Sequence, residues 1–198
     1  MLTKRIGIYA GTFDPVHTGH MAFALQAMEA AALDEIYFMP ERRPRHRASV
    51  EHFAHRVAML NQATLPYKHF GVLESVDTAF TVKRTLPMLK HKFKGAQLVF
   101  LFGSDVVASL PDWPYASQLL QTSELIIAAQ TDKDTTGLQA AMALWPAQPQ
   151  AAVMLTSYAP TVSSSIIRDA LRARQPVPGL LQSVARYSNR HWLYVSFR

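Results

Sequence analysis

The order of the short hydrophobic segments is the feature of this sequence that most restricts its fold. Six of them read as β-strands, at residues 5–11, 35–40, 70–75, 97–103, 124–130 and 151–157. They are hydrophobic on both alternating faces, which is typical of strands in a parallel sheet that helices cover on both sides. The pattern therefore predicts six strands of a covered parallel sheet.

Helix-like segments lie between and after these strands. They span residues 21–32, 50–63, 81–93, 136–145, 163–174 and 179–190. Pro87 makes the third helix doubtful or kinked, because a proline inside a helix removes a backbone hydrogen bond. The alternation predicts an α/β fold with a doubly wound, mostly parallel sheet and a small helical C-terminal part. We expect one domain over residues 1–198, since the segment 145–150 is typical of a surface loop.

The charge and the cysteine content restrict the class of partner and of chemistry. The net charge of +6 suits nucleic acid or a polyanionic small molecule such as a nucleotide. The sequence contains no cysteine, so disulfides, thiolate metal ligands and a thiol nucleophile are excluded. No hydrophobic stretch approaches the roughly 20 residues of a membrane span, and the first segment is too short for a signal peptide. We therefore expect a cytoplasmic protein with no membrane partner.

The segment GTFDPVHTGH, residues 11–20, joins the first strand to the following helix. Ligands of open α/β sheets bind beyond the carboxyl ends of the strands, where this segment lies. Gly11 lets a ligand approach the backbone, and Thr12 supplies a hydroxyl and neighbouring N–H groups. His17 and His20 are three residues apart at the helix start, so both point to one side. The free N–H groups of a helix N-terminus suit phosphate.

Competing interpretations of this segment are weaker. The chain has no G-x-x-x-x-G-K-[ST] motif, and this turn has no G-x-G-x-x-G, which argues against a P-loop and a dinucleotide-binding loop. A metal site is also disfavoured, because no third ligand stands near the two histidines at helical spacing. Gly19 lies between them and leaves room for a group to pack against the helix. The segment is therefore interpreted as a phosphate site.

Two further segments make the resemblance to a known family specific. GTFDPVHTGH is similar to the first signature of the HxGH nucleotidyltransferase superfamily, and TVSSSIIR at 161–168 resembles its ISSTxIR signature. The ending ARYSNRHWLYV at 185–195 is similar to that of the bacterial nicotinate-nucleotide adenylyltransferases. The matches extend from residue 6 to residue 195, and the total length is that of the family.

The resemblance implies an adenylyltransferase. In this family a phosphate oxygen of a mononucleotide attacks the α-phosphorus of ATP and releases pyrophosphate. Positioning and stabilisation of negative charge accelerate such transfers. The implied catalytic residues are His17, His20 and Arg168. The resemblance also implies Mg²⁺ as a cofactor, carried by the triphosphate, with no dedicated protein metal site.

The implied ATP-binding residues come from three segments. The segment GSDVVASLPDW, residues 103–113, is similar to the family's G-[AT]-D motif that ends in tryptophan. Asp105 could equally be the N-cap of a helix. One serine among residues 163–165 could likewise be a simple N-cap. The full ATP-binding set is Gly11, Thr12, Phe13, Gly19, Gly103, Asp105, Ser163, Ser164 and Ser165.

The implied acceptor-binding residues are Arg47, Arg56, Phe80, Thr81 and Trp113. The two arginines are cations that could hold phosphate. Trp113 would stack on a pyridine ring, although a tryptophan there could also simply close a hydrophobic edge.

Three departures from the family pattern leave alternatives open. In the first departure, the family usually has Gly-Gly where this chain has Ala10-Gly11. The other two departures concern the acceptor half of the site. Lys83-Arg84 stands where the family has a Y-T-x-D-T-L-like segment, and Gln130-Thr131 replaces Arg-Pro. We expect AMP transfer to nicotinate mononucleotide in NAD biosynthesis.

The alternatives are nicotinamide mononucleotide or phosphopantetheine as the acceptor, or a nucleotide-binding regulator without catalysis. A class I aminoacyl-tRNA synthetase is excluded by the length and by the missing K-M-S-K-S motif. We expect ATP and a mononucleotide as partners. Nucleic acid is not expected as a partner, because the basic cluster at 41–47 has no aromatic residues. The sequence gives no oligomeric state.

Overall fold

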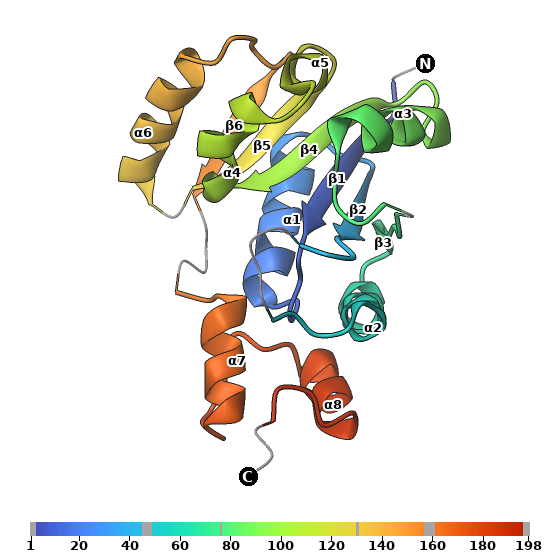
Figure 1. The fold of residues 1–198 in the computed structure, drawn as a ribbon, viewed down its shortest axis with the longest axis vertical. Helices are drawn as coiled ribbons and strands as arrows, with labels where there is room; N and C mark the ends of the chain where they lie inside the picture. The colour runs from blue at the N-terminus through green and yellow to red at the C-terminus, as the bar shows by residue number, and fades with distance from the viewer. Residues whose placement is uncertain (1–2, 45–48, 76, 130, 157–160, 196–198) are drawn as a thin grey trace.

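The computed structural model describes residues 3–44, 49–75, 77–129, 131–156 and 161–195 (Figure 1). One parallel sheet has the strand order β3-β2-β1-β4-β5-β6. Its strands are β1 (Arg5–Gly11), β2 (Glu35–Pro40), β3 (Phe70–Val72), β4 (Gln97–Gly103), β5 (Glu124–Ala129) and β6 (Ala152–Thr156). The predicted doubly wound α/β class is confirmed. β3 is shorter than predicted, and the predicted last residues of β5 and β6 lie outside the described residues.

The helices follow the predicted alternation and include two short ones that were not predicted. They are α1 (Thr18–Ala30), α2 (Phe53–Thr64), α3 (Val82–Lys92), α4 (Ser104–Ser109), α5 (Ala116–Gln121), α6 (Asp132–Ala143), α7 (Ser164–Arg172) and α8 (Gln182–Arg190), with a 3₁₀ turn η1 (Leu110–Asp112). The helix α3 continues through Pro87, whose ring is exposed. The helices α4 and α5 have six residues each, too few for a hydrophobic period to mark them in the sequence.

Two hydrophobic layers cover the two faces of the sheet. Along β4, Phe100 faces a layer formed with α3 and α5, while its neighbours Val99 and Leu101 face a layer formed with α1, α2 and α8. All three side chains are fully buried. This alternation explains why the strand segments are hydrophobic on both faces.

The strand order reverses between β1 and β4. Ligands of open α/β sheets bind at such a reversal, beyond the carboxyl ends of the strands. Those ends are Gly11 in β1 and Gly103 in β4. In Figure 1, α7 and α8 lie below the sheet, in the direction in which β1 and β2 point. The two motifs from opposite ends of the sequence are therefore brought to one end of the sheet.

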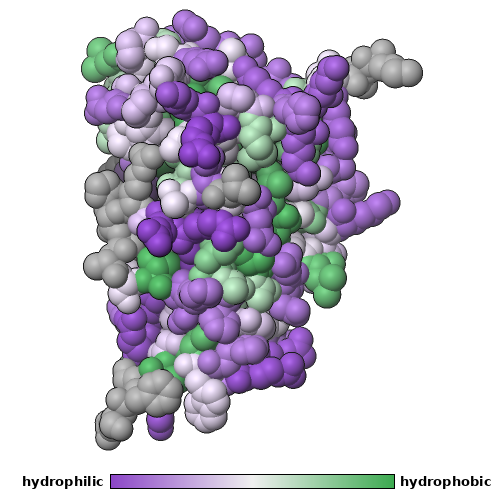
Figure 2. Space-filling model, turned by 45° about the vertical axis from the view of Figure 1, so that its right-hand side comes forward, coloured by the Kyte–Doolittle hydropathy of each residue, from purple (hydrophilic) through white to green (hydrophobic). Residues whose placement is uncertain are grey.

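The surface carries no long hydrophobic helix in the described part of the chain: none of its helices combines the length and hydrophobicity of a membrane span. Figure 2 shows a mainly hydrophilic face with separate hydrophobic patches. The exposed large hydrophobic side chains belong to different segments of the chain: Leu25, Leu65, Tyr115, Leu144, Ile166 and Trp192. The cytoplasmic location stays a prediction.

Candidate active site

The turn after β1 is held by aromatic packing beneath it. The ring of Phe13 is buried and lies 5.3 Å from the Tyr9 ring and 5.0 Å from the His20 ring, between centroids. A Cβ atom on Gly11 would lie 3.0 Å from Phe13 Cζ, closer than ordinary contact. A side chain at position 11 would therefore crowd the Phe13 ring under the turn. The Thr12 carbonyl accepts a hydrogen bond from Arg56 Nη1 at 2.7 Å.

His17 and His20 form a close pair of rings tilted by 32° at the start of α1, with Gly19 between them in the first turn. Their ring centroids are 3.7 Å apart. The backbone N–H of His17 donates to Nδ1 of His20 at 3.2 Å, so the neutral ring of His20 carries its proton on Nε2. Burial lowers the pKa of His17 to about 4. Burial, and secondarily His17, lowers the pKa of His20 well below its usual value. Both rings are therefore neutral near pH 7.

A buried carboxylate, Asp14, connects this turn to the end of the chain. Its Oδ1 accepts from Tyr194 Oη at 2.7 Å. Arg168 Nη1 donates to the Asp14 carbonyl at 2.7 Å and lies 3.7 Å from Oδ2. Sequence reasoning did not assign Asp14 to the site. Two of its contacts come from residues more than 150 positions away, and its Oδ1 also accepts from the Glu51 N–H at 3.4 Å, so no local pattern reveals them.

The three serines at the start of α7 have different partners. Ser163 Oγ accepts from the Ile166 N–H at 3.3 Å and so caps the helix. Ser164 Oγ donates to the Pro15 carbonyl at 3.0 Å, which ties α7 to the turn after β1. Ser165 is exposed, and its Oγ accepts from Arg168 Nη2 at 3.2 Å.

A cavity of about 450 Å³ lies at the reversal of strand order. Eight predicted site residues from the ATP-binding and catalytic sets line it: Gly11, Thr12, Phe13, His20, Gly103, Asp105, Ser164 and Arg168. Seven lining residues were not predicted: Tyr9, Ala10, Asp14, Glu41, Phe102, Val106 and Ser109. Four predicted residues are close in sequence to lining residues but do not line this cavity: His17, Gly19, Ser163 and Ser165. The structure therefore brings the two motifs together around one polar space.

Gly103 and Asp105 lie at the carboxyl end of β4. The N-cap position of α4 is Gly103, with no side-chain cap, so Asp105 does not act as the N-cap that the sequence left open. A Cβ atom on Gly103 would lie 2.5 Å from Asp105 Oδ1. Gly103 therefore gives the Asp105 carboxylate room beside the strand end, and both residues line the large cavity.

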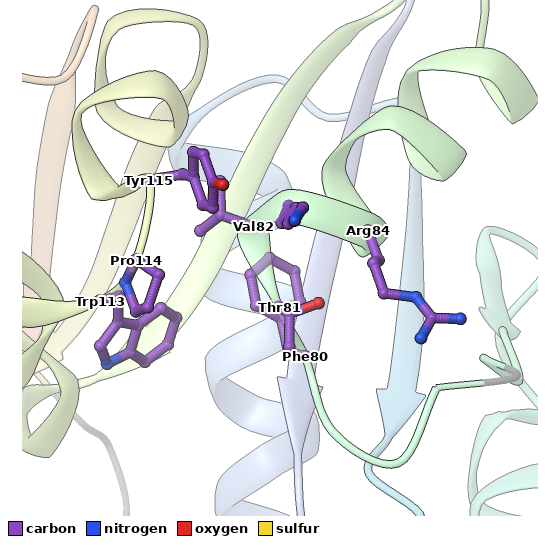
Figure 3. A pocket seen from close by; sticks show the side chains of 8 residues that line it. Phe80, Thr81, Val82, Arg84, Trp113, Pro114 and Tyr115 are labelled. Atoms are coloured by element: carbon purple, nitrogen blue, oxygen red, sulfur yellow. The ribbon is translucent and has the colours of Figure 1, made fainter.

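A second, smaller cavity of about 230 Å³ has mostly aromatic and aliphatic walls. Its lining residues are Phe80, Thr81, Val82, Lys83, Arg84, Trp113, Pro114 and Tyr115 (Figure 3). Phe80 and Trp113, whose ring centroids are 6.0 Å apart, also line the large cavity. The two cavities therefore adjoin at these two rings. Thr81 Oγ1 is buried and has no hydrogen-bond partner among the described residues.

The remaining predicted acceptor residues are the two arginines. Arg56 is 1% exposed and lines neither cavity. Its guanidinium donates to four backbone carbonyls, those of Thr12, Glu41, Arg42 and Glu51. In this structure it therefore fixes the loops around the site, and its role in holding phosphate stays a prediction. Arg47 lies outside the described residues.

Glu41 is a further residue that sequence reasoning missed. Its Oε1 accepts from the Phe80 N–H at 3.1 Å, and its carbonyl accepts from Arg56 at 2.7 Å. It therefore links the loop after β2 to Phe80, one of the two aromatic residues that both cavities share. The position of Glu41 directly after the predicted second strand was a possible signal of a site residue. Its side chain, however, accepts from a backbone N–H, a partner that has no signature in the sequence.

The fold and the adjoining cavities define a Rossmann-like nucleotidyltransferase. The chain belongs to the cytidylyltransferase-like family, whose model matches residues 8–170. It is 30% identical to the nicotinate-nucleotide adenylyltransferase of Bacillus subtilis and 32% identical to a probable one of Bacillus pumilus. Each alignment covers 98% of this chain and 100% of the relative.

A solved structure has the same fold. It is the Plasmodium falciparum nicotinic acid mononucleotide adenylyltransferase complexed with NaAD, which matches with a TM-score of 0.75 and 18% identity. The match covers 96% of this chain and 97% of that chain. The predicted membership in the nucleotidyltransferases is confirmed, and the chain is an enzyme of that class.

Proposed function

We propose that this enzyme transfers AMP from ATP to nicotinate mononucleotide and forms deamido-NAD and pyrophosphate. The observation that carries the proposal is the polar cavity joined to the aromatic one at Phe80 and Trp113. ATP in the first and a pyridine ring in the second would bring the acceptor phosphate and the α-phosphorus together between them. The names of the two Bacillus relatives support the same reaction.

The chemical step needs little from the protein beyond positioning and charge stabilisation. A phosphate oxygen of the acceptor attacks the α-phosphorus, and the bond from that phosphorus to the pyrophosphate oxygen breaks. His20 offers an Nε2–H donor that needs no protonation, because its Nδ1 already accepts from the His17 N–H. Donors of this kind stabilise the charge that develops on pyrophosphate.

Arg168 and the start of α7 supply the other positive groups. Arg168 lines the large cavity beside Ser164, the first residue of α7, and the start of that helix adds backbone N–H groups. The side chains of Ser164 and Arg168 each bond a carbonyl of the Asp14-Pro15 pair. We propose that this arrangement holds the triphosphate between the two motifs.

Mg²⁺ is proposed to enter with ATP, coordinated by the triphosphate oxygens. Nucleotidyltransferases generally use a divalent metal with ATP. Among the described residues no group of three histidines or carboxylates could hold a metal by itself. Asp105 and Glu41 are the carboxylates that face the large cavity with the fewest internal partners, since Asp14 is bonded by Tyr194. Their carboxylate oxygens could hold a Mg²⁺ ion that the triphosphate carries, and the ion would offset the negative charge of the phosphates.

A pyrophosphate-release assay with separate acceptors tests the proposal. We expect nicotinate mononucleotide to give a higher kcat/KM than nicotinamide mononucleotide or phosphopantetheine. A preference for either of the others would overturn the acceptor and keep adenylyl transfer. Binding of ATP without turnover of any acceptor would instead favour a nucleotide-binding regulator.

A further inference from the structure

The small aromatic cavity has positive charge at its rim and no acidic residue among its described lining. Lys83 and Arg84 are the two cations. Arg84 Nε lies 2.9 Å from Asp77 Oδ1, so its charge is already paired. Figure 3 shows the Arg84 guanidinium turned away from Trp113 and Tyr115. Arg84 is therefore poorly placed to contribute charge to the cavity.

Lys83 is different because its charge is not compensated within the described part of the chain. It forms no ion pair there, and its Nζ lies 5.9 Å from the centroid of the Tyr115 ring, which also lines the cavity. Lys83 stands in the first turn of α3, where the helix dipole favours a carboxylate and disfavours a cation. Within the described part of the chain, the contact with the Tyr115 ring is what the fold gains from this cation. A negatively charged ligand in the cavity would gain an ion pair from it.

The other lining residues suit a flat ring but do not distinguish a charged substituent on it from a neutral one. Trp113, Phe80 and Tyr115 offer aromatic surfaces to a flat ring. The buried hydroxyl of Thr81 lacks a partner among the described residues. A hydroxyl can donate to a carboxylate or to an amide oxygen, so Thr81 serves either substituent. A charged group at the cavity is therefore needed to distinguish the carboxylate from the neutral amide.

We propose that Lys83 is a specificity-determining residue whose ammonium group pairs with the carboxylate of an aromatic ring bound in this cavity. The inference rests on the proposed function, since that carboxylate is the one of nicotinate mononucleotide. A neutral carboxamide ring gains no such ion pair. Because Lys83 is exposed, the preference it gives is moderate and falls as salt screens the charges.

The decisive variant is Lys83→Gln, which removes the charge and keeps most of the length. We expect the ratio of kcat/KM for nicotinate mononucleotide over nicotinamide mononucleotide to fall about threefold to tenfold at low salt. The loss should appear in KM rather than kcat, and the effect should shrink at high salt. Lys83→Arg should restore most of the preference. The matched control is Lys90→Gln, which removes the same charge from an exposed position near the end of α3.

Three outcomes would overturn the proposal: an unchanged ratio, equal losses for both acceptors, or the same shift in Lys90→Gln. Calorimetry of nicotinate mononucleotide binding without ATP tests the role of Lys83 separately from the proposed reaction. If the wild-type enzyme binds that nucleotide more tightly than Lys83→Gln does but turns over no acceptor, the proposed function fails and the role of Lys83 stands. If it turns over the nucleotide and Lys83→Gln binds it equally well, the role of Lys83 fails alone.

Discussion

Tyr194 donates a hydrogen bond to Asp14 over 2.7 Å between Oη and Oδ1, across 180 positions of sequence. Both side chains are buried, and burial together with the Asp14 carboxylate raises the pKa of Tyr194, so the phenol stays protonated. The backbone carbonyl of Asp14 accepts from Arg168. The end of the chain therefore supports the turn that leads to the two histidines.

Tyr194→Phe should destabilise the protein by about 1–3 kcal/mol, because a buried carboxylate loses one donor. We also expect a lower kcat, since Asp14 and Arg168 lose part of what positions them. Urea unfolding and initial rates measure the two effects. Tyr187→Phe is the matched control, because its hydroxyl pairs with His55 on α2 instead. Equal effects of the two variants would contradict the role assigned to Tyr194.

His20→Ala should lower kcat by about two orders of magnitude or more while the fold is kept, the scale of losing one preorganised donor. The physical reason is the Nε2–H that His20 offers to the large cavity. Circular dichroism and pyrophosphate release measure folding and turnover. His55→Ala removes a histidine from α2, away from both cavities, and should retain turnover. A fully active His20→Ala enzyme would refute the mechanism.

The strands were predictable where hydrophobicity is continuous. The bounds of β1, β2 and β4 agree with the sequence prediction, because these strands are buried on both faces. The edge strand β3 is shorter than predicted, and its three residues are only partly buried. The region of α4, η1 and α5 gave no helical period, because each piece is shorter than two full turns.

The location of the candidate site was predictable where the signal is local. The histidine pair and the serines were selected from spacing within single segments, and His20 and Ser164 from these segments line one cavity, while His17, Ser163 and Ser165 do not. The support beneath them was not predictable, because it depends on distant pairs and on backbone carbonyls. Arg56 illustrates the limit: a cation in a helix suggested phosphate, yet its hydrogen bonds go to four carbonyls. A carbonyl has no signature in the sequence.

Acidification should destabilise the protein through His17. Its pKa falls from 6.5 in the unfolded chain to about 4 on burial, so between these values the unfolded state binds more protons. Stability present above pH 6.5 is then lost as the pH falls, by about 2 kcal/mol at pH 5 from His17 alone. His20 acts in the same direction.

Urea unfolding at pH 7.5 and pH 5 measures this loss. His17→Gln should flatten the dependence, because glutamine does not titrate. If the wild-type protein and His17→Gln lose equal free energy between the two pH values, burial of a neutral His17 is not the cause.

Glu124→Gln should reduce stability without changing catalysis. Arg5 donates to both oxygens of Glu124, at 3.0 and 2.7 Å, and its Nε donates to the Ala31 carbonyl. This partly buried, two-bonded pair lies at the amino ends of β1 and β5, opposite the cavities. Losing its charge should cost about 1–2 kcal/mol, because bidentate pairs of this kind are stronger than ordinary surface pairs.

The control for this prediction is an ion pair with one contact, which also lies at the amino ends of the strands. Lys4 contacts Glu35 at 2.7 Å, but its side chain is 53% exposed. Lys4→Gln should therefore cost less than about 0.5 kcal/mol, as is typical of exposed pairs. Thermal unfolding and KM for ATP are measured for both variants. A raised KM in Glu124→Gln would mean that the amino ends of the strands are coupled to the site, because no residue of this pair lines either cavity.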